Sequence, residues 1–328
     1  MYLFKEKPIR NTIDVNQQAL SLIEDGFRRL QAGEVTMPPV LSMPIADKNG
    51  EMDAKTAYVK GMDQFALKIS TGFFDNPDKG LPSLSGMMLL FHSDTGFPAA
   101  VLQDNGYLTD VRTGIAGAVA AKYLAKDEAR IAGIVGTGTQ ARFQLRALKM
   151  VRPSIEKVYV YGRKKERIEA YQREMEHELG VTTEAADLET VVRNCDVLVT
   201  TTPSTEPFIK KEWLHPGLHI TAMGSDASEK NEIEPDVLGA VDILACDAAS
   251  QVFSIGEHRT AKEAGIIDES STVEIGAIIS GDARGRETME QVTFCDLTGT
   301  GVQDTAIAVY TYDQLKASGE GIEITEDE

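Results

Sequence analysis

The 328-residue chain has few cysteines, fewer basic than acidic residues, and no long apolar run. Its three cysteines, Cys195, Cys246 and Cys295, are far apart, and each lies in an apolar strand-like run without a second Cys or His nearby. This pattern favours buried, reduced thiols over disulfides, and we predict no metal site. Lys and Arg number 33 against 51 Asp and Glu, a formal net charge of −18, which argues against nucleic acid or an anionic membrane as a partner.

No apolar segment approaches the roughly 20 residues that a membrane-spanning helix needs. The amino-terminal segment MYLFKEKPIR lacks the apolar core of a signal peptide, so we expect a cytoplasmic protein. The excess of acidic residues indicates a solubilising surface or adaptation to a salty cytoplasm. The acidic tail GIEITEDE is expected to be solvated and partly disordered.

From about residue 128 onward, short β-branched runs alternate with helix-like segments. The strand candidates are RIAGIVG, KVYVYG, DVLVTTT, LHITAMG, VDILACD and VTFCDL, and helix candidates between them include TQARFQLRALKMV and KKERIEAYQREMEHEL. Apolar strands separated by amphipathic helices predict a parallel sheet covered on both faces. We therefore predict an α/β fold with a Rossmann-type, doubly wound domain over residues 128–300.

Residues 1–127 have a different pattern. The segment DVNQQALSLIEDGFRRLQAGEV predicts an amphipathic helix, because its apolar residues recur close to a 3.6-residue period. The strand-like pieces TAYVKG, FALKIS, SGMMLLFHSDTG and FPAAVLQDNG are separated by turn signals and predict an antiparallel sheet in a second domain. A final helix, TGVQDTAIAVYTYDQLKAS, could belong to either domain.

The stretch IAGIVGTGTQARFQLRAL contains the pattern Gly136-x-Gly138-x-x-Ala141 at the first strand-to-helix junction of the α/β region. Gly136 allows a tight turn, Gly138 lets the backbone approach a pyrophosphate, and Ala141 lets the helix pack closely on the strand. Free N–H groups and the partial positive charge of a helix N-terminus favour phosphate binding. The pattern therefore predicts a dinucleotide cradle, and a tight turn without a ligand is the alternative.

The end of the second strand, in KVYVYGRKKER, bears on which dinucleotide is bound. A free ribose 2′-hydroxyl usually meets an Asp or Glu there, whereas this chain has Gly162, Arg163, Lys164 and Lys165. The missing acid and the nearby cations suit a 2′-phosphate. We therefore favour NADP(H) and leave NAD(H) open, since Arg163 could instead stack on adenine while the lysines face water.

Five segments together resemble the ornithine cyclodeaminase and μ-crystallin family. They are FALKIS, YLTDVRTGIAGAVAAKYLA, GIVGTGTQA, AMGSDASEKNEI and DLTGTGVQDTAIA, and they follow the family's order and spacing over nearly the whole chain. The segments MPPVLSM, FFDNPDKGLPSLSG and LQDNGYLTDVRT resemble the branch that includes ectoine-catabolism proteins and iminosuccinate reductase. The resemblance implies hydride exchange at the α-carbon of an amino or imino acid, with a nicotinamide dinucleotide as donor or acceptor.

The resemblance also implies a domain organisation. Residues 1–127 would form an α+β substrate-binding and dimerisation domain, into which the Rossmann domain of residues 128–300 is inserted. Residues 301–328 would return to the substrate domain as a helix followed by the acidic tail. The sheet of the substrate domain would pair across a homodimer.

Three residues would carry the chemistry by this resemblance. Arg112 offers a planar fork of donors and would bind the substrate carboxylate; a salt bridge to Asp110 or another acid is its alternative. Lys68, in the apolar strand FALKIS, would hold the carboxylate or polarise the imine, unless it is a snorkelling edge lysine. Asp226 would be the acid and base at the imine nitrogen, and its alternative is a helix N-cap for the segment around Glu232.

The remaining site residues are assigned to the cofactor. They lie beside the substrate arginine, in the glycine pattern and at the ends of the strands: Thr113, Gly136, Thr137, Gly138, Thr139, Gln140, Ala141, Gly162, Arg163, Lys164, Thr201, Thr202, Pro203, Met223, Gly224, Ser225, Thr298 and Gly299. Asp304 would join Thr298 and Gly299 in a turn near the carboxamide. His258 has no evident partner in its segment GEHRTA and is expected at the surface.

One departure from the family narrows the substrate. Ornithine cyclodeaminases have an arginine after a proline early in the substrate domain, where this chain reads PPV at 38–40. Lys55 aligns with a glutamate that suits the side-chain ammonium of ornithine, and a lysine would repel that ammonium by about 4 kcal/mol at roughly 4 Å and an effective dielectric of about 20. We therefore expect a dicarboxylic substrate, with iminosuccinate reduced to L-aspartate as the leading case. Its carboxylates would meet Arg112 and Lys68 at one end and Lys55 at the other.

Two alternatives stay open at this point. A lyase-type cyclodeaminase would borrow and return the hydride, converting L-ornithine to L-proline and ammonia or acting on a diamino acid of ectoine catabolism. A protein resembling μ-crystallin would bind NADPH and a small ligand without catalysis. The presence of Lys68, Arg112 and Asp226 together favours an enzyme.

Overall fold

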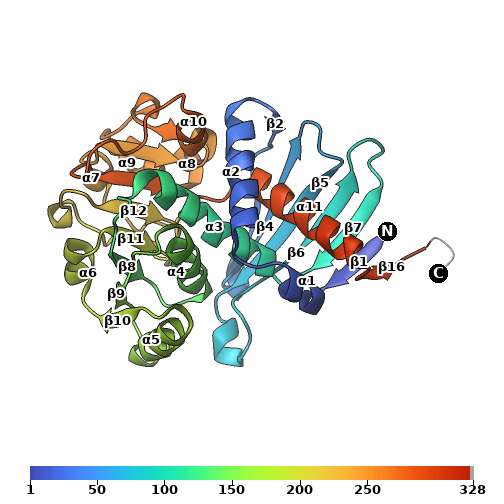
Figure 1. Ribbon diagram of the computed structural model, residues 1–328, viewed down its shortest axis with the longest axis horizontal. Helices are drawn as coiled ribbons and strands as arrows, with labels where there is room; N and C mark the ends of the chain where they lie inside the picture. Colours follow the sequence, from blue (N-terminus) through green and yellow to red (C-terminus); the bar gives the residue numbers. More distant parts are fainter. Residues whose placement is uncertain (326–328) are drawn as a thin grey trace. The chain divides into compact units, whose positions relative to one another are not determined.

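The computed structural model describes residues 1–325 and contains two compact units (Figure 1). Unit 1 comprises Met1–Asp14, Ser21–Arg112 and the described residues from Thr300 onward. Unit 2 comprises Val15–Leu20 and Thr113–Gly299. The predicted α/β fold, with a parallel Rossmann-type sheet inserted into a second domain, is confirmed.

The division between the units falls within helices. α3 (Tyr107–Leu124) begins in unit 1 and continues in unit 2, so the predicted boundary at residues 127 and 128 is too late. Glycines on α3 let it pack closely inside unit 2: a Cβ on Gly114 would lie 2.8 Å from the carbonyl oxygen of Phe143. The predicted amphipathic helix, α2 (Gln17–Gln31), also begins in unit 2 and continues in unit 1.

Unit 1 is built on one mixed sheet. Its strands are β1 (Tyr2–Lys5), β2 (Val35–Thr36), β3 (Leu41–Ile45), β4 (Gly50–Val59), β5 (Gln64–Phe73), β6 (Leu84–His92), β7 (Pro98–Gln103) and β16 (Ile322–Glu323). They lie in the order β16-β1-β7-β6-β5-β4-β2, and β3 pairs with β4. Neighbours from β2 to β7 are antiparallel, as predicted, whereas β1 and β7 are parallel.

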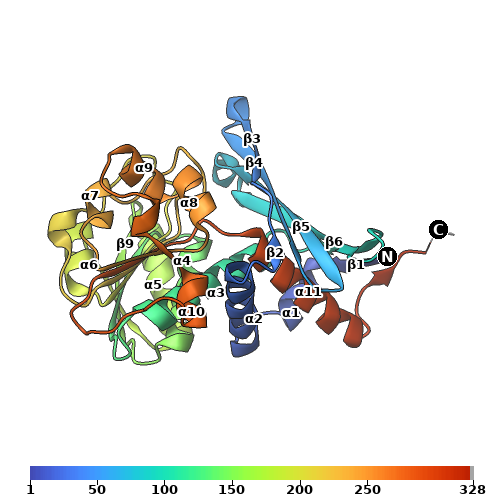
Figure 2. The ribbon, with the colours of Figure 1, turned by 90° about the horizontal axis from the view of Figure 1, so that it is seen from above.

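α11 (Gly301–Ala317) covers one face of this sheet. It packs against β4 and β5, and α1 (Glu6–Thr12) contacts it on the same side (Figure 2). The close approach requires glycine at position 301, because a Cβ there would lie 2.2 Å from the carbonyl oxygen of Thr56. The hydroxyl of Thr305 then donates to a backbone carbonyl of β4 at 2.8 Å and accepts from a backbone amide of β5 at 3.2 Å. The final helix, which the residue pattern left open, therefore lies in unit 1.

The two ends of the chain meet in the unit 1 sheet. β16 pairs with β1 in antiparallel register, with Leu3 opposite Ile322, and the amide of Ile324 donates to the carbonyl of Met1 at 2.7 Å. Residues 322–324 are exposed, as expected of a solvated tail, but the expectation of disorder is wrong for them, because the edge of β1 offers them hydrogen-bond partners. Residues 326–328 lie outside the described part of the chain.

Unit 2 is built on a sheet whose paired strands are all parallel. Its strands are β8 (Ile131–Val135), β9 (Lys157–Tyr161), β10 (Thr182–Ala185), β11 (Val197–Thr200), β12 (His219–Ala222), β13 (Ile243–Cys246), β14 (Val273–Glu274) and β15 (Thr293–Asp296). Its further helices are α4 (Thr139–Val151), α5 (Lys165–Leu179), α6 (Leu188–Asn194), α7 (Pro235–Leu238), α8 (Ala249–Ile255), α9 (Glu257–Glu263) and α10 (Ile275–Ser280).

The strand order of unit 2 locates its ligand-binding edge. The order is β10-β9-β8-β11-β12-β15-β13-β14, whose first five positions match the start of the doubly wound order 3-2-1-4-5-6, with β15 inserted between β12 and β13. The winding reverses between β8 and β11. In such sheets ligands bind beyond the carboxyl ends of the strands at this switch point, which is where the segment after β8 begins.

The absences noted in the sequence have structural counterparts. Cys195, Cys246 and Cys295 are free and buried, as predicted, and burial raises the pKa of each thiol. Among the helices of residues 1–325, none combines the length and the apolar character needed to cross a bilayer.

Candidate active site

The glycine loop, residues 136–141, joins β8 to α4 at the switch point. Gly136 has a φ of +115°, and a Cβ on it would lie 2.4 Å from the hydroxyl of Thr201, so only glycine fits there. Gly138 is the N-cap of α4, and a Cβ on it would meet no atom within 4 Å. The N-terminus of α4 therefore has open space beside Gly138, while Ala141 is fully buried. This is the geometry of a pyrophosphate cradle.

An arginine that the sequence analysis did not single out orders this loop. Nη1 of Arg142 donates to the carbonyl oxygens of Thr137 at 2.7 Å and Gly138 at 3.0 Å. Its Nε donates to Glu174 at 2.7 Å, which fixes the guanidinium. The loop carbonyls are thus turned toward Arg142, which holds the loop in one conformation.

The end of β9 lies next to the glycine loop. A Cβ on Gly162 would lie 2.9 Å from Cγ2 of Thr137, so this close approach requires glycine. Arg163 and Lys164 follow and are exposed. The end of this strand is where a Rossmann sheet contacts the adenosine ribose, so both cations follow the part of the sheet that is expected to meet it.

The ends of β11 and β12 are held together by Glu232. Its Oε1 accepts a hydrogen bond from the Thr202 amide at 2.7 Å. Its Oε2 accepts from the Gly224 amide at 2.9 Å and from the Thr200 hydroxyl at 2.6 Å. The cofactor residues predicted after these two strands therefore lie on adjacent loops of the same sheet edge.

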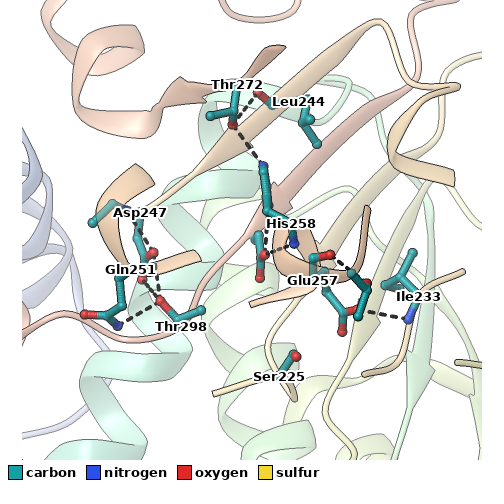
Figure 3. A network of polar contacts seen from close by, with 12 residues as sticks. Ser225, Ile233, Leu244, Asp247, Gln251, Glu257, His258, Thr272 and Thr298 are labelled. Carbon is teal, nitrogen blue, oxygen red and sulfur yellow. Dashed lines mark hydrogen bonds and ion pairs between the residues drawn. The ribbon is translucent and has the colours of Figure 1, made fainter. Parts of the chain in front are cut away.

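A second buried acid, Glu257, holds the segment that carries Glu232. Its Oε1 accepts from the Glu232 amide at 2.8 Å, and its Oε2 accepts from the Ile233 amide at 3.2 Å and from the side-chain amide of Asn231 (Figure 3). Burial raises the pKa of Glu232 to about 7, although its hydrogen bonds oppose this rise. Burial, together with the nearby carboxylates of Asp296 and Glu232, raises the pKa of Glu257 well above its usual value.

The loop after β15 is anchored by Asp247. The hydroxyl of Thr298 donates to Oδ1 of Asp247 at 3.1 Å, and the amide of Gly299 donates to Oδ2 at 2.8 Å. Gln251 adds a bond from Nε2 to the Thr298 hydroxyl at 2.8 Å (Figure 3). The grouping of Asp304 with this turn is wrong, because Asp304 lies in the first turn of α11 in unit 1.

His258 is buried, so the prediction of a surface histidine is wrong. Its Nδ1 lies 2.9 Å from Oδ2 of Asp296, and its Nε2 lies 2.9 Å from the hydroxyl of Thr272 (Figure 3). The segment GEHRTA looks polar throughout, but α9 buries one face of it. The two partners come from distant parts of the sequence, which is why no local pattern indicated them.

Asp226 stands at an exposed turn after β12. Its Oδ1 lies 2.6 Å from Nζ of Lys230, and the Asp226 side chain is 47% exposed against 9% for Lys230. Ser225 closes the loop by donating from Oγ to the Lys230 carbonyl at 2.7 Å. The helix N-cap alternative is wrong because the next helix begins only at Pro235. An exposed carboxyl beside an ammonium can exchange a proton with solvent and with a bound ligand.

Unit 1 contains a cluster of buried charges, called the cationic cluster below, formed by Lys55, Lys68, Arg112 and Asp304. Oδ1 of Asp304 lies 2.9 Å from Nε of Arg112, and its Oδ2 lies 3.8 Å from Nζ of Lys68. The contact between Arg112 and Asp304 is an ion pair that lacks the alignment of a hydrogen bond. Neither Nε of Arg112 nor Oδ1 of Asp304 therefore has a hydrogen-bond partner among the described residues. Nη1 of Arg112 donates to Gln303 at 3.1 Å. Within residues 1–325, one aligned bond out of five possible donors leaves the guanidinium with capacity for an anionic ligand.

The structure shows the ion-pair partner of Arg112 and the exposure of Lys68, on which the alternatives predicted for these two residues depend. Arg112 forms its salt bridge with Asp304 rather than Asp110, so the ion pair and a ligand-binding role are compatible on one side chain. Lys68 lies on β5, between β4 and β6, and its side chain is 4% exposed. The alternative that Lys68 is an edge-strand lysine extending into solvent is therefore wrong.

Lys55 is the direct cross-strand neighbour of Lys68 in the pairing of β4 and β5. Opposite residues of an antiparallel pair point to the same face, with Cα atoms about 4.5–5.5 Å apart. The expectation that Lys55 meets the far end of the substrate from Lys68 is therefore wrong, because the strand register places the two lysines side by side. Like charges directly opposite each other are unfavourable unless anionic groups lie beside them.

Sequence reasoning missed three residues that organise these sites, Arg142, Glu232 and Glu257, and it misplaced a fourth, Asp304. Only Asp304 carried a signal, as the single charged residue in the first half of a helix rich in small and apolar residues, where a buried charge needs a partner. The other three lie in polar segments whose burial depends on tertiary contacts.

Comparison with known proteins identifies relatives over the whole chain. The model of the ornithine cyclodeaminase/mu-crystallin family matches residues 4–319. An uncharacterized cyclodeaminase of Sinorhizobium fredii is 44% identical over 325 residues, which cover 98% of each chain. The iminosuccinate reductase of Paracoccus denitrificans is 33% identical over 328 residues, which cover 99% of each chain.

Solved structures agree with these relatives. The Δ1-pyrroline-2-carboxylate reductase of Thermococcus litoralis, in complex with NADH and L-proline, is similar with a TM-score of 0.94 and 28% identity, over 99% of this chain and 100% of that one. An archaeal alanine dehydrogenase dimer with bound NAD is similar with a TM-score of 0.92 and 34% identity, over 99% of both chains.

Proposed function

The chain belongs to the ornithine cyclodeaminase/mu-crystallin family, and we propose that it reduces a small dicarboxylic α-imino acid with a nicotinamide dinucleotide. The proposed reaction is iminosuccinate to L-aspartate, with amino-acid oxidation as the reverse direction. The observation that carries this proposal is the pair of opposed, buried lysines, Lys55 and Lys68, in the same cluster as Arg112.

The cationic cluster suits an acid with two carboxylates. Arg112 offers a planar fork for one carboxylate, and the two neighbouring ammonium groups offer point charges for another. A substrate that ends in an ammonium, such as ornithine, would instead be repelled by Lys55, by up to about 4 kcal/mol at roughly 4 Å.

The residues of unit 2 fit a bound dinucleotide. The open space beside Gly138 would accept a pyrophosphate, and a Cβ at that position would project into it. When bound in its reduced form, the dinucleotide supplies the hydride for the imine carbon. Two relatives were solved with NADH and with NAD, while Arg163 and Lys164 of this chain favour a 2′-phosphate, so we propose NAD(P)(H) with a preference for NADP(H).

Asp226 is proposed to move the proton at the substrate nitrogen. Imine reduction adds a hydride to carbon and a proton to nitrogen, so a proton donor is needed beside the nitrogen. Asp226 gives its carboxyl proton to the nitrogen and regains one from solvent, because its side chain is 47% exposed. A general acid of this kind contributes about 10²–10⁴-fold to the rate. Arg112 orients the substrate by holding its α-carboxylate, and Lys55 and Lys68 hold the second carboxylate.

We also propose a homodimer that uses the sheet of unit 1. Large apolar side chains are exposed on one face of its strands β3, β4 and β6: Leu41, Met43, Tyr58 and Met87. A patch of this kind on a sheet face is typical of a protein–protein interface. The archaeal alanine dehydrogenase, a relative, was solved as a dimer. A cytoplasmic location and a role in ectoine catabolism stay predictions.

Reductive turnover tests the proposed reaction. Oxaloacetate, ammonia and NADPH or NADH are supplied together, and aspartate formation is followed by chromatography alongside the loss of reduced-nicotinamide absorbance. We expect aspartate in stoichiometric proportion to the oxidised cofactor, and no proline from ornithine. Proline formation without aspartate formation would overturn the substrate assignment. An Arg112→Gln variant should lose turnover while keeping its affinity for the dinucleotide.

A cyclodeaminase is the second candidate, favoured by the 44% identical relative of that name. It would release ammonia from a diamino acid while the cofactor returns to its starting oxidation state. Steady loss of reduced-nicotinamide absorbance excludes this candidate, and ammonia release from ornithine at constant absorbance supports it.

A further inference from the structure

Glu232 takes no chemical step in the proposed reaction, yet it is a fully buried acid at the sheet edge that carries the cofactor residues. Burying a carboxylate is unfavourable unless hydrogen bonds compensate for lost water. Three donors do so here, at 2.6–2.9 Å: the Thr202 amide, the Gly224 amide and the Thr200 hydroxyl.

These donors come from two neighbouring strands. Thr200 is the last residue of β11 and pairs with Ala222, the last residue of β12. Thr202 and Gly224 each lie two residues further along their own chain segment. The carboxylate of Glu232 therefore continues the connection between the strands beyond the end of their ladder. Its Oε1 accepts from Thr202 after β11, and its Oε2 accepts from Gly224 after β12 and from Thr200 of β11.

The surrounding packing fixes this arrangement. A Cβ on Gly224 would lie 2.2 Å from the carbonyl oxygen of Thr202 and 2.4 Å from Oε2 of Glu232, so the three residues are in close contact. The backbone of Glu232 is itself held, because its amide donates to Glu257 at 2.8 Å. A displacement of the carboxylate would therefore move both loops.

We propose that Glu232 is a positioning residue whose carboxylate sets the separation between the loop of Thr202 and the loop of Asp226. These loops carry the residues assigned to the dinucleotide and to proton transfer. The consequence for cofactor binding therefore rests on the proposed function, whereas the bridge between the loops does not.

The variant Glu232→Gln tests the bridge directly. Glutamine keeps the size of the side chain, but its NH₂ group faces a hydrogen-bond donor instead of accepting from it. Amide hydrogen exchange measured by mass spectrometry, at about pH 8 where the acid is ionised, should become about tenfold faster or more in the peptides containing Thr202 and Gly224. Glu229→Gln is the matched control, because Glu229 is an exposed acid of the same loop, and it should leave both peptides unchanged.

Dinucleotide affinity is the second readout. The Kd for NADPH or NADH, measured by nicotinamide fluorescence, should weaken about tenfold in Glu232→Gln and stay unchanged in Glu229→Gln. A merely structural acid would lower the melting temperature but leave amide exchange and the Kd of the folded protein unchanged, and this result overturns the proposal. If the wild-type chain binds neither dinucleotide, the proposed function fails, and the exchange data alone decide whether the bridge exists.

Thr200→Val serves if Glu232→Gln does not fold. Valine has a similar shape and removes one of the three donors, so exchange in the Gly224 peptide should become about threefold faster. Unchanged exchange in this variant would contradict the bridge.

Discussion

Replacing Gly138 by alanine should weaken dinucleotide binding while leaving the fold intact. Replacing Gly136 by alanine should instead lower the stability of the fold. A methyl group at Gly138 projects into open space in the free protein. The backbone φ of this residue is −83°, which alanine adopts without strain. The remaining effect is the poorer N-cap preference of alanine, about 1 kcal/mol or less.

Gly136 is constrained by the protein itself. Its φ of +115° is a glycine conformation, and forcing alanine into it costs on the order of 1–3 kcal/mol. The methyl group would also lie 2.4 Å from the Thr201 hydroxyl, an overlap that costs about 1–3 kcal/mol more. We therefore expect a free energy of unfolding lower by about 2–6 kcal/mol for Gly136→Ala.

Urea unfolding and titration with NADPH and NADH measure the two effects separately. Gly138→Ala should unfold within about 1 kcal/mol of the wild type but bind the dinucleotide at least about tenfold more weakly, because the methyl group occupies the approach of the pyrophosphate. If Gly138→Ala binds both dinucleotides as the wild type does, the glycine loop is only a tight turn. The cofactor assignment in unit 2 would then be refuted.

Three further predictions follow from the same structure. Lys55→Glu should lower kcat/KM for iminosuccinate by about a hundredfold or more, because it replaces an attractive charge with a repulsive one. Lys60→Glu, at an exposed position, is the control. Full activity of Lys55→Glu would contradict the dicarboxylate assignment. Arg163→Ala should raise KM for NADPH about tenfold and change KM for NADH less than about twofold. The exposed Arg173→Ala is the control, and equal effects on both cofactors would refute the 2′-phosphate contact. The folded-state pKa of Glu232 is raised from 4.5 to about 7, so its contribution to stability is greatest below about pH 4.5 and is lost as the pH rises to 7. Over this pH range the free energy of unfolding, measured in urea, should therefore fall by on the order of 3 kcal/mol less in Glu232→Gln than in the wild type. Parallel pH dependences of the two proteins would show that Glu232 does not titrate in this range.

The sequence predicted those parts of the sites that depend on local spacing. The glycine loop follows from three residues within one short segment, and the buried position of Lys68 follows from its apolar neighbours in FALKIS. The alternation of strands and helices after residue 128 was sufficient for the parallel sheet, because such strands are apolar along their whole length.

Features that depend on distant pairings were not predictable in this way. The opposition of Lys55 and Lys68 depends on the register of a hairpin, which neither strand specifies alone. The partners of His258 and Asp304 come from other elements, so their burial cannot be recognised from polar neighbours in sequence. The boundary between the two units within α3 likewise depends on which helix the glycines of α3 contact. The sequence pattern of α3 is helical on both sides of this boundary, so the pattern does not reveal it.

The position of α11 in unit 1 constrains the order in which the chain can fold during synthesis. Unit 2 is complete when residue 299 has left the ribosome, and its parallel sheet can then close. The face of β4 and β5 that α11 buries stays uncovered until residue 317 has emerged, although both strands were made long before. The buried partner of Arg112 and Lys68 also arrives with that last helix. The nascent chain must therefore keep this face of β4 and β5 exposed to solvent while unit 2 folds.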